Sequence, residues 1–85
     1  MKKYIQQDFL VTIILKNCNW INEVISINSQ KYDGFTPESL PGDIATYLIK
    51  ELRSWHETNN IVLVNYWAKD YFTYEIDKDG QIIIQ

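Results

Sequence analysis

The stretch from Phe9 to Leu15 alternates between two sets of apolar side chains, and this pattern limits the possible folds more than any other feature. In an extended strand, successive side chains point to opposite sides of the sheet. One side would carry Phe9, Val11, Ile13 and Leu15, and the other Leu10 and Ile14 with Thr12. A strand with two largely apolar sides is predicted to lie inside a sheet or under a helix.

Residues 20–27 are rich in β-branched side chains, which predicts a second strand paired with the first. The turn between these strands is expected at residues 17–19, because asparagine tolerates the left-handed backbone of a tight turn. A helix remains an alternative for residues 20–27, because four of their apolar side chains also recur at helical spacing. These four are Trp20, Ile21, Val24 and Ile25.

The middle of the chain is predicted to hold one long loop followed by the main helix. Residues 29–42 lack apolar periodicity and contain both prolines and two of the three glycines, a composition typical of a loop. The helix is expected to begin near Pro41 or Gly42, since proline suits a first turn and breaks a helix interior. It then runs to about Glu57, with an apolar stripe of Ile44, Leu48, Leu52 and Trp55.

The last quarter of the chain is predicted to form three strands, at residues 61–67, 71–77 and 81–85. Residues 68–70 would connect the first two strands, and the Asp-Gly turn at residues 78–80 the last two. Tight connections favour antiparallel neighbours, so the predicted fold is a single α+β domain over residues 1–85. It is a two-layer sandwich of order ββαβββ, with about five mainly antiparallel strands and one helix packed on one face.

Composition narrows the class of protein. Hydrophobic residues make up 46% of the chain and charged residues 22%, as in globular proteins. No apolar stretch is long enough to cross a membrane, and polar residues 6–8 interrupt any signal-peptide core. Cys18 is the only cysteine, which fits a reducing compartment. The chain is therefore expected to be an unprocessed, soluble, cytoplasmic protein that does not bind a membrane.

No catalytic motif stands out in the sequence. His56 is the only histidine, and its place near a helix end suits a solvated side chain better than a catalytic one. Glu75 and Asp77 share one side of a predicted strand, but carboxylates act as an acid and base pair only where a pocket shifts their pKa values. No cysteines or histidines are paired at metal-ligand spacing. We therefore expect neither an enzyme nor a cofactor or metal site.

The segment from Tyr66 to Tyr74 holds five aromatic residues within nine positions. Strand alternation directs Phe72, Tyr74 and Ile76 toward the core and Tyr71, Glu75 and Asp77 toward solvent, with Trp67 expected to join the solvent set across the hairpin. Exposed aromatic rings among carboxylates are typical anchors of a protein interface. The alternative is an aromatic pair across two strands that only stabilises an exposed sheet face.

Acidic residues dominate the later part of the chain. The net charge is −3, but residues 32–85 carry nine acidic and four basic residues, a net −5. Asp33 and Glu38 form a second acidic set within the long loop. This balance argues against a nucleic-acid partner and favours a protein partner with a basic surface.

These features lead to a hypothesis for function. In its small size and acidity the chain resembles, in general character, the bacterial immunity proteins that neutralise toxins. That resemblance implies an inhibitor, as a monomer or weak dimer, that covers the basic site of a toxin such as a nuclease. The expected contacts are Trp67, Tyr71, Glu75, Asp77, Asp33 and Glu38. The alternative is an accessory protein of a phage or mobile element that dimerises through the sheet edge at residues 81–85.

Overall fold

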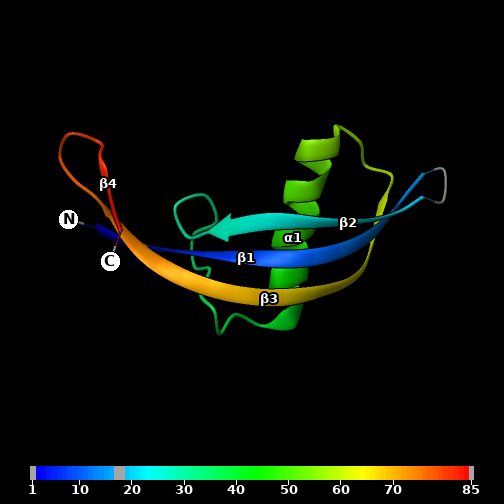
Figure 1. Ribbon diagram of the computed structural model, residues 1–85, viewed down its shortest axis with the longest axis horizontal. Coiled ribbons are helices and arrows are strands. Elements are labelled where there is room, and N and C mark those ends of the chain that lie inside the picture. The colour runs from blue at the N-terminus through cyan, green and yellow to red at the C-terminus, as the bar shows by residue number, and fades with distance from the viewer. Residues whose placement is uncertain (1, 17–18, 85) are drawn as a thin grey trace.

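The computed structural model describes residues 2–16 and 19–84. It contains, in chain order, β1 (Lys2–Leu15), β2 (Trp20–Asn28), α1 (Pro41–His56), β3 (Ile61–Ile76) and β4 (Ile82–Ile84). The strands form one curled antiparallel sheet in the order β2-β1-β3-β4, and α1 crosses one face of that sheet (Figure 1). The predicted α+β class, with one helix on an antiparallel sheet, is confirmed, although these residues form four strands rather than about five.

Strand β1 lies inside the sheet, as its two apolar sides predict, with β2 on one side and β3 on the other. Residues 20–27 lie within a strand and not a helix, and β2 pairs with β1 in one unbroken register from Gln6↔Asn28 to Ile14↔Trp20. The predicted turn at residues 17–19 falls mostly on positions 17 and 18, outside the described residues.

Strand β3 is one continuous strand where the sequence predicted two strands and a connection. The strand continues through residues 68–70 because β1 begins at Lys2, well before the predicted Phe9, and so offers pairing partners to β3 on both sides of them. The pairing passes from Phe9↔Ala68 to Gln7↔Tyr71, so β3 carries one extra residue opposite Asp8. This β-bulge accommodates residues 69–70, which the sequence analysis had assigned to a connection between two strands.

Helix α1 begins and ends for reasons that the sequence contains. Pro41 occupies its first turn, where the missing N–H costs nothing, and Asp43 places a negative charge near the N-terminus. The helix ends at His56, because Glu57 adopts a left-handed backbone with φ of 52° and donates its N–H to the Arg53 carbonyl. The predicted bounds therefore hold to within a residue.

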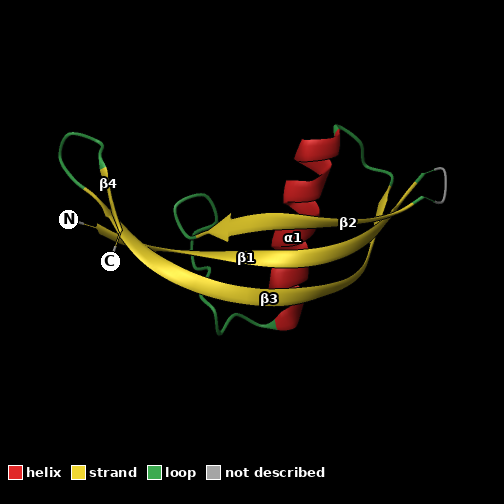
Figure 2. Cartoon of the chain, in the orientation of Figure 1, coloured by secondary structure: helices red, strands yellow, loops and turns green. Residues whose placement is uncertain are grey.

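The core lies between α1 and the odd-numbered side of β1. Phe9, Val11 and Ile13 pack with side chains from β2, α1 and the long loop. The neighbours that complete this cluster are Ile25, Ile27, Phe35, Ile44, Leu48, Leu52 and Ile61. The predicted helix stripe is wrong at Trp55, which is 70% exposed, while Glu51 is buried in its place. Figure 2 shows the resulting two layers, with the helix on one side of the strands only.

Candidate functional site

The face of the sheet opposite α1, here called the helix-free face, carries the even-numbered side chains of β1. Partners in an antiparallel pair share a face, and Leu10 pairs with Val24 on β2 and with Trp67 on β3. These three side chains form a row across three strands, which we call the central row. All three are exposed, and Trp67 is exposed to 67%. The sheet thus presents an apolar row to solvent.

A second apolar row lies four residues farther along β1, where Ile14 pairs with Trp20 and Val62. Polar side chains separate and flank the two apolar rows. Between the rows, the Thr12 hydroxyl donates a hydrogen bond of 2.8 Å to Asn22 Oδ1. On the far side of the central row, the Ser26 hydroxyl donates one of 2.5 Å to Asp8 Oδ1. The central row is therefore bordered by polar groups that bond one another across strands.

The bulge opposite Asp8 decides which residues accompany Trp67. In a regular strand Trp67 and Tyr71 would share a face, because they lie four residues apart. The extra residue reverses the alternation, so Trp67 pairs with Leu10 on the helix-free face while Tyr71 pairs with Gln7 on the opposite face. Tyr71 is also exposed, at 53%. The structure therefore does not bring these two predicted contacts together.

The four predicted acidic contacts lie in different places. Glu75 shares the face of Tyr71, as the alternation predicted, and stands opposite Lys3 in the register. Asp77 follows β3, where its Oδ1 accepts hydrogen bonds of 2.9 and 2.8 Å from the backbone N–H groups of Asp79 and Gln81. This carboxylate orders the β3–β4 turn. Asp33 and Glu38 are exposed in the loop between β2 and α1. The six predicted contacts thus do not form one surface.

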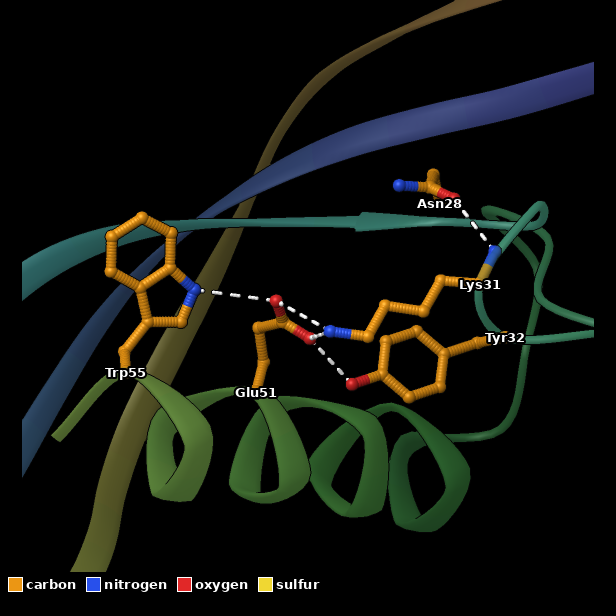
Figure 3. A network of polar contacts seen from close by, with 5 residues as sticks. All are labelled: Asn28, Lys31, Tyr32, Glu51 and Trp55. Carbon is orange, nitrogen blue, oxygen red and sulfur yellow. Dashed lines mark hydrogen bonds and ion pairs between the residues drawn. The ribbon is translucent and has the colours of Figure 1, made fainter. Parts of the chain in front are cut away.

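A buried carboxylate that the sequence did not reveal lies on α1. Glu51 is 9% exposed and accepts hydrogen bonds from three side chains, as Figure 3 shows. Lys31 Nζ lies 2.8 Å from Oε2, the Tyr32 hydroxyl lies 2.5 Å from the same oxygen, and Trp55 Nε1 lies 3.3 Å from Oε1. Asn28 Oδ1 accepts the backbone N–H of Lys31 at 2.8 Å. This network attaches the start of the long loop to the helix.

The network shifts the pKa values of two of its members in opposite directions. Burial by itself raises the pKa of the Glu51 carboxyl, but the hydrogen bonds from Lys31 and Tyr32, the Lys31 charge and the Trp55 bond outweigh it. The net result is a Glu51 pKa below its usual value. Burial, and then the hydrogen bond and negative charge of Glu51, raise the pKa of the Tyr32 phenol far above its usual value. At neutral pH the pair is a carboxylate and a neutral phenol.

Alkaline titration tests this arrangement. The pKa of Tyr74 is also raised, by burial and by the neighbouring Tyr4, so two phenols of the folded protein should ionise late. Because their folded pKa values lie above the unfolded value of about 10, the stability they contribute is present below pH 10 and is lost as the pH rises further. Absorbance at the phenolate band should show this late step, and Tyr32→Phe should remove part of it. An unchanged late step in Tyr32→Phe contradicts the burial of Tyr32.

The sequence predicted a solvated His56, but in the structure its side chain contacts β2. Its Nε2 lies 2.6 Å from Oε1 of Glu23, without the alignment of a hydrogen bond. Both side chains are about three-quarters buried, at 22% and 26% exposure. The contact joins the last turn of α1 to the outer strand of the sheet and turns the only charged side chain of β2 toward the helix.

Comparison of the chain with protein-family models, with curated proteins and with solved structures finds no match. Within residues 2–16 and 19–84, no three His, Cys, Asp or Glu side chains gather closely enough to hold a metal ion. In the same part of the chain, no helix has the length and apolar character that crossing a membrane requires.

Of the residues that form the central row, sequence reasoning singled out only Trp67. Leu10 and Val24 were visible as apolar positions in predicted strands, but a strand can bury either side. The signal that marks Leu10 is that both sides of residues 9–15 are apolar while the sequence predicts a single helix. One helix covers one face, so one apolar side had to remain open.

Proposed function

We propose that this chain is a non-catalytic protein-binding module that docks a protein partner on its helix-free face, as an inhibitor of the immunity or antitoxin kind. The observation that carries the proposal is the central row, in which Trp67 is exposed at the β3 end beside Leu10, with polar groups on either side of the row. An aromatic anchor surrounded by apolar contacts and a polar rim is the usual arrangement of the strongest contacts in protein interfaces.

The size of the apolar surface supports a protein as the ligand. Trp67 and Trp20 are each about two-thirds exposed, and a buried tryptophan covers about 150–250 Å². Leu10 and Val24 in the central row and Val62 in the second row are exposed as well, and exposed apolar rows bordered by polar residues are typical of protein interaction sites. Exposed apolar side chains lower solubility, so their presence on this face favours a surface that a partner covers.

Charge supports a basic partner. The net charge is −3, and Asp33 and Glu38 are exposed in the loop between β2 and α1. Carboxylates outside the contact raise the rate of association with a basic protein and make that rate sensitive to salt. In this proposal Trp67 supplies most of the affinity, and the loop carboxylates speed the encounter.

A matched pair of variants tests the proposed face. The first candidate partner is the protein encoded beside this gene, and its affinity is measured by calorimetric titration. Trp67→Ala should weaken binding by about 30- to 700-fold, equivalent to about 2–4 kcal/mol. Tyr71→Ala, on the same strand but on the opposite face, should leave the affinity nearly unchanged. If Tyr71→Ala weakened binding and Trp67→Ala did not, the binding surface would be that of Tyr71 and Glu75.

The inhibitory role needs its own measurement. The partner that binds in the titration should lose its activity when one equivalent of the chain is added. The Trp67→Ala variant should need a much higher concentration to produce the same inhibition. Reversing the charges of Asp33 and Glu38 to lysine should slow association and reduce its dependence on salt. A partner that stays fully active while saturated with the chain is incompatible with inhibition.

A further inference from the structure

We propose that the outer edge of β2 binds an extended segment of a partner protein, which pairs with it antiparallel and adds a fifth strand to the described sheet. The segment carries three consecutive apolar residues between polar ones, and its middle residue lies opposite Val24. It belongs to the protein partner of the proposed function, on which this inference rests, and adds an edge contact to the contact on the helix-free face.

The other open edges of the described strands are protected against strand addition. Two bulges interrupt β3, one opposite Asp8 and one opposite the step from Thr12 to Ile13. The exposed Lys69 lies within the first bulge, and β4 has only three residues. Bulges, edge lysines and short strands are the usual means by which proteins prevent edge pairing. Strand β2, by contrast, extends over nine residues in one register with β1 and contains no proline, glycine or lysine.

The β1–β2 ladder shows which backbone groups of β2 point outward. Ser29 donates its N–H to the Ile5 carbonyl at 2.9 Å, just beyond the end of β2. Bonded pairs recur at every second position of an antiparallel ladder, so the odd-numbered residues of β2 bond β1. The N–H and C=O groups of Asn22, Val24 and Ser26 therefore point away from the sheet. An antiparallel segment would bond all of them.

Helix α1 reaches past this edge and limits the kind of partner that fits there. The helix begins beside β3, where the Tyr66 hydroxyl donates to the Pro41 carbonyl, and ends beside β2. In Figure 1 its last turns extend beyond β2 on the side away from β1. A partner strand that carried its own helix on that side would collide with α1, which excludes β2 of a second copy. A lone extended segment occupies only the plane of the sheet and fits beside β2.

Trp55 supplies an apolar wall on the helix side of this edge. It belongs to the last turns of α1 and is 70% exposed, and Figure 3 shows its ring projecting from the helix on the side of β2. A hydrogen bond of 3.3 Å from its Nε1 to Glu51 Oε1 orients the ring. A side chain that is already ordered loses little conformational entropy when a partner packs against it. Exposed tryptophans of this kind anchor many protein interfaces.

The two faces of β2 determine which side chains a paired segment should carry. The residue opposite Val24 extends the central row on the helix-free face, so it should be apolar. Its two neighbours turn to the helix side, where Ile25 is buried and Trp55 is exposed, so they should be apolar as well. The residues opposite Asn22 and Ser26 meet exposed polar side chains and should be polar.

Titration with a peptide tests the pairing directly. The probe is a seven-residue peptide, acetylated and amidated at its ends, with the sequence lysine-threonine-leucine-valine-leucine-threonine-lysine. With a dissociation constant of about 1 mM or tighter, it should shift the amide resonances of Asn22, Val24 and Ser26 and slow their hydrogen exchange. N-methylation of the peptide's valine removes the central N–H of the pairing and should weaken binding at least about 10-fold.

Substitutions separate edge pairing from docking on the helix-free face. Ser26→Pro removes an outward N–H without breaking a bond to β1, because an edge strand tolerates proline where the N–H faces solvent. It should abolish peptide binding, whereas Ser26→Ala keeps the N–H and should bind like the wild type. Trp55→Ala should weaken binding about 5-fold or more, and Trp67→Ala should leave it unchanged. Circular dichroism should show that all these variants are folded.

The outcomes distinguish this proposal from the proposed function. A peptide that causes no shifts at about 5 mM overturns the edge pairing and leaves Trp67 free to anchor a partner on the helix-free face. Shifts confined to another edge, or equal binding by the N-methylated peptide, overturn it as well. If the peptide binds as expected while Trp67→Ala binds the protein partner like the wild type, the edge is confirmed and the proposed face is wrong.

Discussion

Replacing Phe35 by alanine is expected to remove about 3–5 kcal/mol from the free energy of unfolding. Phe35 belongs to the long loop, yet it is only 1% exposed and packs edge-on against Phe9 and Tyr47, at ring-centre distances of 6.3 and 6.0 Å. The total free energy of unfolding of a small domain is about 5–15 kcal/mol, so this one substitution should remove a large part of it. The thermal midpoint should fall by about 12–40 °C.

Leu40→Ala provides the control for that prediction. Leu40 is an apolar residue of the same loop, but it is 70% exposed, so its truncation should change the free energy of unfolding by less than about 0.5 kcal/mol. Urea unfolding of both variants measures the difference. A loss below about 1 kcal/mol for Phe35→Ala would place its ring outside the core, where it would be free to contact a partner.

Replacing Glu51 by alanine is expected to cost about 2–4 kcal/mol at pH 7, the second largest effect. The change removes the acceptor of three hydrogen bonds and leaves the Tyr32 hydroxyl without its partner. Lys31 is half exposed, so its charge stays hydrated and the cost remains below that of a fully buried ion pair. The long loop, which Lys31 and Tyr32 attach to the helix, should become more accessible to proteases.

The cost of Glu51→Ala should depend on pH. The folded pKa of Glu51 is lowered, so the stabilisation by its carboxylate is present above the unfolded pKa, about 4.5, and is lost as the pH falls through the folded pKa. The difference in unfolding free energy between wild type and variant should therefore shrink on acidification from pH 7 to about pH 3. Glu38→Ala removes an exposed carboxylate and should have little effect at pH 7. Equal losses for Glu51→Ala at both pH values would contradict the carboxylate's role.

Much of the architecture could be predicted from local pattern. The two apolar sides of Phe9–Leu15 predicted an inner strand, and Pro41 with the apolar stripe predicted the helix nearly to the residue. The division of β3 into two strands was wrong because residues 68–70 read locally as a connection. Whether such a polar segment ends a strand depends on the partner strand, and here β1 is long enough to pair with β3 both before and after it.

The candidate site was less predictable than the fold. Trp67 was correctly predicted to be exposed, but the sequence assigned it to the face of Tyr71 and Glu75. A single extra residue opposite Asp8 reverses the alternation, and a bulge has no local sequence signal at this position. Glu51 was missed for a related reason, because its donors Lys31 and Tyr32 come from a loop whose path depends on the fold.

The sequence by itself determined the α+β class, the order of the first two strands and the helix, and the presence of more apolar strand surface than one helix covers. Those properties follow from alternation, helical spacing and turn chemistry, which act between residues close along the chain. Only the tertiary structure decided that Phe35 belongs to the core and that Trp67 shares a face with Leu10 and Val24. The place of Phe35 depends on the path of the long loop, and that of Trp67 on register between distant strands, where a shift of one residue moves a side chain to the other face.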